Sequence, residues 1–310
     1  MYSVEADNLI KRYGSNDALR GVSFHVDSGE IFGIIGPDGA GKTSIFRILT
    51  TLILPEGGSA RVLGLDVVKD YHEVRRRVGY MPGRFSLYQD LSVEENIRFF
   101  ATLFGTTLEE NYDLVKDIYS YLEPFRKRKA GALSGGMKQK LALSCALIHK
   151  PEVLFLDEPT TGVDPVSRKE FWIMLTRLKQ QGLSIVVSTP YMDEATLCDR
   201  IALIEKGRFM DTDTPSGIIS KFTLPLLAVS GPHMPSLLRD IRQVPQVLSC
   251  FAFGDTHHVV LRENGLSDEA QIDLLNTALY AKGHSDLAIR HIKPNVEDCF
   301  MYLDTLEEHS

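Results

Sequence analysis

The sequence is poor in cysteine. Four cysteines occur in 310 residues, at Cys145, Cys198, Cys250 and Cys299, and no two of them are close in the sequence. Such spacing fits neither a zinc site, which uses closely paired ligands, nor the disulfide framework of a small secreted domain. We therefore expect four buried or inert thiols.

Long apolar runs are also missing. A bilayer-spanning helix needs about 20 mostly apolar residues, whereas the most apolar stretches, Ile31–Ile35 and Leu224–Val229, are short. The first residues, MYSVEADNLIKRYG, lack the positive start, apolar core and small-residue cleavage site of a secretory signal. The sequence predicts a protein that stays in the cytosol and does not cross a membrane.

An excess of basic residues is absent as well. Lys and Arg number 34 against 41 Asp and Glu, which gives a formal net charge of −7. This balance leaves no basic surface for broad nucleic-acid binding, so we expect no nucleic-acid partner. What is present is an ordinary globular composition, 44% hydrophobic and 24% charged. The length allows one large domain and one small one.

Short apolar runs alternate with helical patterns in the first two thirds of the chain. Glu30–Ile35, Val153–Leu156 and Ile185–Val187 are apolar runs of the kind found in strands covered on both faces. Their alternation with helical spacing predicts an α/β fold with a mostly parallel sheet. From residue 87 to about 150 the pattern is mainly helical and opens with a Ser-x-x-Glu capping box, which predicts a helical subdomain.

A second composition follows the sequence DTDTPSG at 211–217, which we expect to be a loop. We expect a large domain over 1–217 and a small α+β domain over 222–310. No internal repeat is found, so the large domain occurs once. The order of elements in the small domain resembles a ferredoxin-like unit. The expected elements are strands Leu224–Val229, Val247–Phe253, His257–Leu261 and Leu287–Ile292, helices near Leu237 and over Asp268–Tyr280, and a final helix.

A glycine-rich loop lies between the first apolar strand and a predicted helix, and it matches the pattern G-x-x-x-x-G-K-[ST]. Glycines let backbone N–H groups converge on phosphate oxygens, and the helix N-terminus adds partial positive charge. Lys42 would reach the β- and γ-phosphates, and Thr43 would ligate Mg²⁺. The predicted nucleotide-binding residues of this loop are Gly36, Pro37, Asp38, Gly39, Ala40, Gly41, Lys42, Thr43 and Ser44.

Two adjacent carboxylates end the second apolar strand. Asp157 stands where an acid can join the Mg²⁺ shell at the carboxyl edge of the sheet. Glu158 would then act as the general base that accepts a proton from the attacking water. The order of strand, loop and acids predicts a nucleoside triphosphate site that uses Mg²⁺.

A third motif, Leu133-Ser134-Gly135-Gly136, opens a helix and predicts a second phosphate-binding helix start. With these three motifs in order, the chain resembles the nucleotide-binding subunits of ABC transporters over about residues 2 to 215. GTPases are disfavoured because the chain contains no Asn-Lys-x-Asp guanine motif. The resemblance implies a P-loop ATPase core that contains the helical subdomain.

The resemblance implies that two such domains pair head to tail, as a homodimer or a heterodimer. Ser134, Gly135 and Gly136 of one copy would then close over the γ-phosphate held by the other. Tyr13 would stack on adenine, and Asp164 would lie in the loop that contacts the second copy. Catalysis by Lys42 and Glu158 would therefore need a dimer.

Residues 222–310 resemble the C-terminal extension of ATPase subunits of drug- and lipid-exporting ABC systems, including the ending Pro294–Phe300. This implies an ATPase subunit that drives export through a separate transmembrane permease. It would lie at the cytoplasmic face of the cell membrane as a peripheral subunit. Two alternatives stay open: a regulatory or scaffold subunit with little hydrolysis of its own, and a soluble ABC ATPase outside transport.

The sequence departs from the family pattern at two positions. Gly83 stands where the family usually has a glutamine that touches Mg²⁺, and Pro190 stands where it usually has a histidine that contacts the γ-phosphate. Neither side chain can donate or accept a hydrogen bond. Gln89, six residues beyond Gly83, could replace the glutamine only if the loop refolded. Our hypothesis is that hydrolysis is retained but is slow or depends on the partner.

Overall fold

The computed structural model describes residues 2–263 and 265–308. The chain divides into two units, one ending at Pro215 and one beginning at Ser216. The first unit is built on a six-stranded sheet with the order β10-β9-β3-β8-β7-β6, in which all strands but β10 are parallel. The strands are β3 (Ile31–Ile35), β6 (Val78–Met81), β7 (Val153–Asp157), β8 (Ser184–Thr189), β9 (Arg200–Glu205) and β10 (Arg208–Asp213).

The central strands are apolar because both faces of the sheet are covered. Every residue of β3, β7 and β8 is buried, as expected for parallel strands between layers. The expected runs Val153–Leu156 and Ile185–Val187 lie in these strands, and the expected run Glu30–Ile35 does so except for Glu30, which precedes β3. The mostly parallel sheet that the sequence predicts is therefore present.

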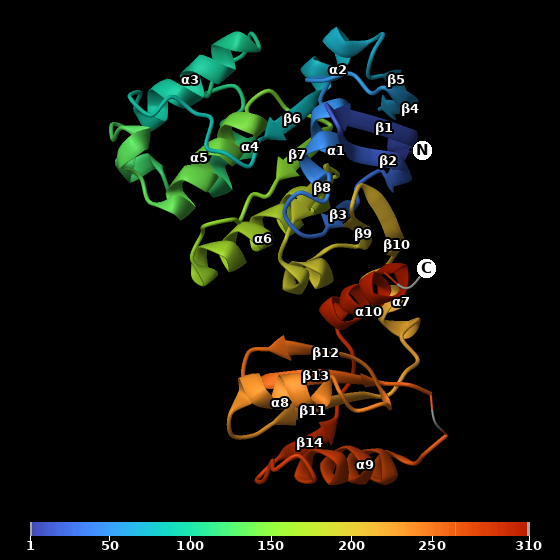
Figure 1. The fold of residues 1–310 in the computed structure, drawn as a ribbon. Helices are drawn as coiled ribbons and strands as arrows, with labels where there is room; N and C mark the ends of the chain where they lie inside the picture. The colour runs from blue at the N-terminus through green and yellow to red at the C-terminus, as the bar shows by residue number, and fades with distance from the viewer. Residues whose placement is uncertain (1, 264, 309–310) are drawn as a thin grey trace. The chain divides into compact units, whose positions relative to one another are not determined.

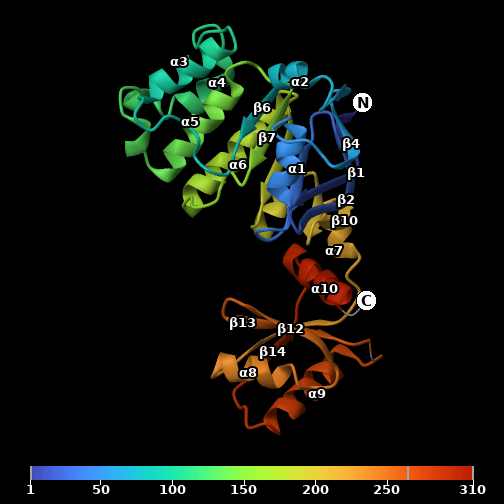
Figure 2. The ribbon, with the colours of Figure 1, turned by 45° about the horizontal axis from the view of Figure 1, so that its top comes forward.

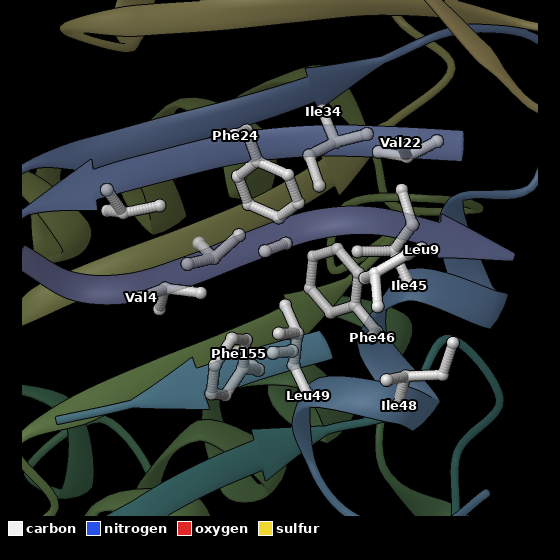
Figure 3. Packing of buried hydrophobic residues seen from close by; sticks show 14 of the residues in the cluster. Val4, Leu9, Val22, Phe24, Ile34, Ile45, Phe46, Ile48, Leu49 and Phe155 are labelled. Carbon is white, nitrogen blue, oxygen red and sulfur yellow. The ribbon is translucent and has the colours of Figure 1, made fainter. Parts of the chain in front are cut away.

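A second, antiparallel sheet with the order β2-β1-β4-β5 was not expected from the sequence. β2 alternates buried and exposed residues over its second half, and β1 does so between its bulges, so the sheet has one apolar face and one solvent-exposed face. Helix α1 (Lys42–Leu49) packs its apolar side between the two sheets, where Phe46 meets Phe155 of β7 edge-on (Figure 3). The strands are β1 (Tyr2–Tyr13), β2 (Asn16–Asp27), β4 (Gly57–Val62) and β5 (Leu65–Asp66).

Three helices follow β6 and form a group of their own beside the sheet, as both views show (Figures 1 and 2). They are α3 (Val93–Leu103), α4 (Tyr112–Tyr119) and α5 (Gly135–Leu147). Ser92 and Glu95 form the capping box at the start of α3. These helices lie within the range 87–150 expected to be helical. Two more α-helices of the unit are α2 (Tyr71–Arg77) before β6 and α6 (Pro165–Gln180) between β7 and β8.

The second unit contains a four-stranded antiparallel sheet with the order β12-β13-β11-β14. Helices α8 and α9 contribute Leu237, Ile241, Leu275 and Leu279 to a core shared with the sheet. Its elements are β11 (Leu226–Ser230), α8 (Met234–Ile241), β12 (Val247–Phe253), β13 (Thr256–Leu261), α9 (Asp268–Tyr280), β14 (Ala288–His291) and α10 (Val296–Glu308).

Several boundaries differ from the sequence prediction, most of them by one or two residues, and two of them have a clear physical reason. The range 211–217 is not a loop, because β10 continues to Asp213 and helix α7 (Pro215–Ser220) begins two residues later. An antiparallel edge strand tolerates polar residues, and proline suits the first turn of a helix. Strand β11 begins at Leu226 rather than Leu224, since Pro225 has no N–H to donate to a ladder.

Candidate functional site

The predicted phosphate loop joins the end of β3 to the start of α1. Gly36 N–H donates to the carbonyl of Thr189 at the end of β8, 3.3 Å away. A Cβ at Gly36 would lie 2.1 Å from the carbonyl oxygen of Ile204, so only glycine fits there. Gly41, the N-cap of α1, has φ 112° and a Cβ would lie 2.5 Å from the carbonyl of Ala18. The loop path thus depends on glycine at both ends.

Lys42 is the first residue of α1 and is only 3% exposed. Its Nζ donates to the carbonyls of Gly36 and Pro37 at 2.8 and 2.9 Å, which holds the ammonium over the loop. The same Nζ lies 3.2 Å from Glu158 Oε1. A buried ammonium with these partners forms a fixed positive charge at the N-terminal end of α1.

Asp157 ends β7 and is 2% exposed. Its Oδ1 accepts a hydrogen bond from Thr43 Oγ1 at 3.3 Å and one from Ser188 Oγ at 2.7 Å. Burial raises the pKa of this carboxyl above its ordinary value, and the two hydroxyl hydrogen bonds oppose that rise. A carboxylate and a hydroxyl side by side are the hard oxygen donors that Mg²⁺ prefers, so the residues present fit this ion.

Glu158 follows directly and takes the left-handed region with φ 50°, which is uncommon for a residue other than glycine. Its N–H donates to Ser188 Oγ and to the Ser188 carbonyl at 3.0 and 3.1 Å. This turn directs the side chain back to Lys42 instead of continuing the strand. The sequence identified both acids, but no pattern pointed to Ser188, a hydroxyl residue at the end of an apolar strand.

A small pocket lies beside the phosphate loop. Tyr13 lies at its edge, 43% exposed, with its hydroxyl 3.4 Å from Ser44 Oγ. An exposed aromatic ring next to a phosphate loop can stack on a base. Asn16 and Ala18 were missed by sequence reasoning because they carry no motif. The lining residues are Tyr13, Asn16, Ala18, Gly39, Gly41, Lys42, Thr43, Ser44 and Glu158.

The Leu-Ser-Gly-Gly motif lies at a different place in the chain's fold. Ser134 is the N-cap of α5 and accepts from Met137 N–H, while a Cβ at Gly136 would lie 2.5 Å from Ser167 Oγ of α6. Asp164 is the N-cap of α6 and accepts from Ser167 N–H at 3.0 Å, and this bond lowers its carboxyl pKa. Gly135 and Gly136 therefore lie next to the Asp164 loop.

Of the described residues, nine line the pocket at the phosphate loop. They do not include Ser134, Gly135, Gly136 or Asp164. One chain thus brings together the loop, Asp157, Glu158 and Tyr13, and separately brings together the serine-glycine motif and Asp164. We predict that a second copy supplies one of the two groups when both contact one ligand. That pairing stays a prediction for this chain.

The two departures from the family pattern both lie at the phosphate site. A Cβ on Gly83 would be 3.0 Å from the carbonyl oxygen of Asp157 and 3.7 Å from Glu158 Cβ. Pro190 follows Thr189, whose carbonyl binds Gly36 N–H. Gln89 instead packs on Gly131, whose N–H donates to the Gln89 carbonyl at 2.9 Å. Gln89 therefore does not take the place of the glutamine missing at Gly83.

The fold and the loop define a P-loop nucleotide-binding domain. Residues 19–161 match the model of the family described as ABC transporter. The chain is 36% identical over 304 residues to Nod factor export ATP-binding protein I of Burkholderia lata, covering 97% of this chain and 96% of that protein. It is 40% identical over 218 residues to the probable multidrug ABC transporter ATP-binding protein YbhF of Escherichia coli K12, covering 69% of this chain. The chain spans only 38% of that second relative's length.

Solved structures agree with this assignment. A structure described as the ATP binding subunit of an ABC transporter is 28% identical and superposes with a TM-score of 0.65, covering 71% of this chain and 92% of that one. The dimeric MJ0796 cassette, 24% identical with a TM-score of 0.62, covers 68% of this chain and 98% of that one, and shares the fold. The chain belongs to the ABC transporter family of ATP-binding proteins, which are ATPases coupled to transport.

Two further expectations concern the rest of the chain. All four cysteines are buried, and burial raises the thiol pKa of Cys145 and Cys198. Within residues 2–263 and 265–308, we find no helix with both the length and the apolar character needed to span a membrane.

Proposed function

We propose that this chain binds MgATP and hydrolyses it to drive export through a separate membrane permease. One observation carries the proposal: Lys42, Thr43, Asp157 and Glu158 converge at a glycine loop on the carboxyl edge of a parallel sheet. Ligands of open α/β sheets bind at that edge. The names of the two relatives, which speak of multidrug transport and of Nod factor export, support the direction of transport.

Thr43 and Asp157 would hold Mg²⁺, which when bound neutralises charge on the β- and γ-phosphates. The loop residues Gly36 to Ser44 would surround the phosphates with N–H groups, and Lys42 would contact the terminal phosphate in place of the loop carbonyls. Glu158 would accept the proton of the attacking water. Tyr13 would stack on the adenine ring.

The active form would be a dimer of nucleotide-binding subunits, either two copies of this chain or this chain with a relative. Ser134, Gly135, Gly136 and Asp164 of one subunit would complete the site of the other, since they lie apart from the phosphate loop of their own chain. A dimeric cassette is described for MJ0796. The permease partner would place the protein at the cytoplasmic face of the cell membrane, with no role for nucleic acid.

The large domain, about residues 1–217, would be the ATPase domain, with its helical subdomain at about 87–150. The second unit, about 222–310, would be an accessory α+β domain of the ferredoxin-like class. Support for this class comes from the element order β11-α8-β12-β13-α9-β14 and the sheet order β12-β13-β11-β14. In that arrangement the second and third strands form a hairpin and the helices share one face.

Hydrolysis would be slow or dependent on a partner, because Gly83 and Pro190 bring no polar side chain to the phosphate site. The retained acids Asp157 and Glu158 support turnover over a purely regulatory role. A soluble role outside transport is not favoured, since both relatives are named as transport or export proteins.

Three measurements on the purified protein test the proposal. Titration with ATP, with and without Mg²⁺, should show saturable binding that Lys42→Ala weakens and that Lys69→Ala, an exposed lysine, does not. Single-turnover hydrolysis should be detectable and should slow by about 100- to 10,000-fold in Glu158→Gln. Isolation of the protein from its native membranes should recover one membrane permease. Failure to bind ATP would refute the function, and binding with no permease would refute the transport role.

A further inference from the structure

Ser188 is a buried hydroxyl in an apolar strand. It belongs to β8, where Ile185, Val186 and Val187 precede it, and its exposed fraction is 0%. A serine in such a place leaves a polar group out of water, which is unfavourable unless the hydroxyl is hydrogen-bonded. The partners of this hydroxyl therefore show why the strand carries a serine at this position.

The two hydrogen-bond partners of the Ser188 hydroxyl are the acidic residues of the site, Asp157 and Glu158. Ser188 Oγ donates to Asp157 Oδ1 at 2.7 Å and accepts from Glu158 N–H at 3.0 Å. The second bond helps to fix Glu158 in its left-handed conformation, φ 50°, from which its carboxylate reaches Lys42. One hydroxyl thus sets the orientation of the Asp157 carboxylate and the backbone of Glu158 together.

Thr161 Oγ1 donates to Glu158 Oε2 at 3.5 Å, at the upper limit of a hydrogen bond. On the side of β7 that faces β6, position 83 adds no further support. Gly83 is the nearby residue there, and its missing side chain can form no hydrogen bond to Asp157 or Glu158. Thr43 also donates to Asp157 Oδ1, but at 3.3 Å, and its hydroxyl is itself a candidate ligand for the ion. Ser188 is therefore the nearer of the two hydroxyls that donate to the Asp157 carboxylate. Its hydrogen bond would also persist when the cation binds, since Ser188 is not a proposed ligand.

We propose that Ser188 is a positioning residue of the ATP site, holding Asp157 in the orientation that receives a divalent cation and holding Glu158 beside Lys42. The proposal rests on the proposed function. Hydrogen-bond partners of metal ligands affect metal affinity by about 10- to 100-fold when they are removed. A merely structural serine would affect folding without affecting the cation.

Strand β8 offers a matched control at its other end. Ser184 is also a buried serine, 2% exposed, and its Oγ lies 2.7 Å from Ser3 Oγ and accepts from Gly29 N–H at 2.9 Å. Ser184→Ala therefore removes a comparable buried hydroxyl from the same strand, at a site remote in sequence from the acids. Ser188→Thr keeps a hydroxyl, and Ser188→Cys keeps the size with a weaker donor.

The experiment measures Mn²⁺ affinity by electron paramagnetic resonance in the full chain saturated with ADP, and ADP affinity separately in EDTA. We expect Ser188→Ala to weaken Mn²⁺ binding by about 10- to 100-fold. ADP binding in EDTA should stay at the parent value in every variant. Ser188→Thr should bind Mn²⁺ more tightly than Ser188→Ala, and Ser184→Ala should bind it as the parent does.

Parent-like Mn²⁺ affinity in Ser188→Ala, or an equal loss in Ser184→Ala, would overturn the positioning role while leaving the proposed function intact. If Ser188→Ala does not fold, Ser188→Cys decides, since an undiminished Mn²⁺ affinity in that variant would overturn the role equally. A parent protein that binds no ADP would refute the proposed function itself, and the two failures are therefore distinguishable.

Discussion

The ammonium of Lys42 lies 3.2 Å from the carboxylate of Glu158, so the group expected to bind phosphate is paired with the group expected to activate water. Both are at least partly buried, with Lys42 3% and Glu158 22% exposed in their side chains. A phosphate that enters the loop must compete with this carboxylate for Lys42. Binding of nucleotide and release of the base are thereby connected through one ion pair.

Replacing Lys42 by alanine should weaken ATP binding. A hydrogen bond to a charged group contributes about 1.5–3 kcal/mol, which corresponds to roughly 10- to 150-fold in affinity. Isothermal titration calorimetry with ATP measures the change. An affinity equal to that of the parent would show that the loop does not use this ammonium.

Replacing Glu158 by glutamine should lower the rate of single-turnover hydrolysis by about 100- to 10,000-fold, the usual contribution of a general base. ATP binding should persist, because the amide leaves Lys42 without its anionic competitor. Rapid quench with labelled ATP measures the rate. A parent rate already as low as that of Glu158→Gln would support the regulatory alternative.

Introducing the glutamine and histidine that the family usually has at positions 83 and 190 should raise the rate of ATP hydrolysis. Pro190→His should increase the single-turnover rate in the dimer, and Gly83→Gln should do so if the chain accommodates a side chain there. The Cβ at position 83 would lie 3.0 Å from the Asp157 carbonyl, so Gly83→Ala is the steric control. A fast parent rate that neither Pro190→His nor Gly83→Gln changes would contradict the hypothesis of slow turnover.

A core substitution in the second unit should lower the stability of that unit and leave ATP binding by the first unit unchanged. Leu275 of α9 is fully buried, and Leu275→Ala should cost about 2–5 kcal/mol of unfolding free energy in that unit. Tyr280→Ala, at the exposed end of the same helix, should change the unfolding free energy by less than about 0.5 kcal/mol. Denaturant unfolding followed by hydrogen exchange of each unit tests this. Loss of ATP binding in Leu275→Ala would contradict two separate units.

Stability of the first unit should fall as pH drops because of His149. Burial lowers the pKa of this imidazole below its ordinary value of about 6.5. The unfolded chain then binds a proton that the folded chain does not, so the free energy of unfolding decreases as pH falls below about 6.5. His149→Phe keeps a ring stacked on Phe104 and should reduce this dependence between pH 7 and pH 5. Identical pH profiles of parent and variant, from urea unfolding, would refute the assignment.

Local patterns were sufficient to predict the parallel sheet and the phosphate loop. Apolar runs such as Val153–Leu156 mark buried parallel strands because both of their faces are covered. The antiparallel sheet of β1, β2, β4 and β5 escaped prediction, since an alternating strand with one wet face gives a weaker signal. The boundary errors at 211–217 and at Leu224 came from an edge strand and from Pro225, whose effects depend on neighbouring strands.

By itself the sequence determined the family and predicted the residues of the ATP site, because Gly36–Ser44, Asp157–Glu158 and Ser134–Gly136 are contiguous motifs that local spacing reveals. Only the tertiary structure decided which of these groups meet. The acids and Lys42 come together because parallel strands end at one edge, while the serine-glycine motif lies next to Asp164, apart from its own phosphate loop. Ser188 became visible only in three dimensions, since a lone hydroxyl has no sequence pattern and its partners belong to a neighbouring strand.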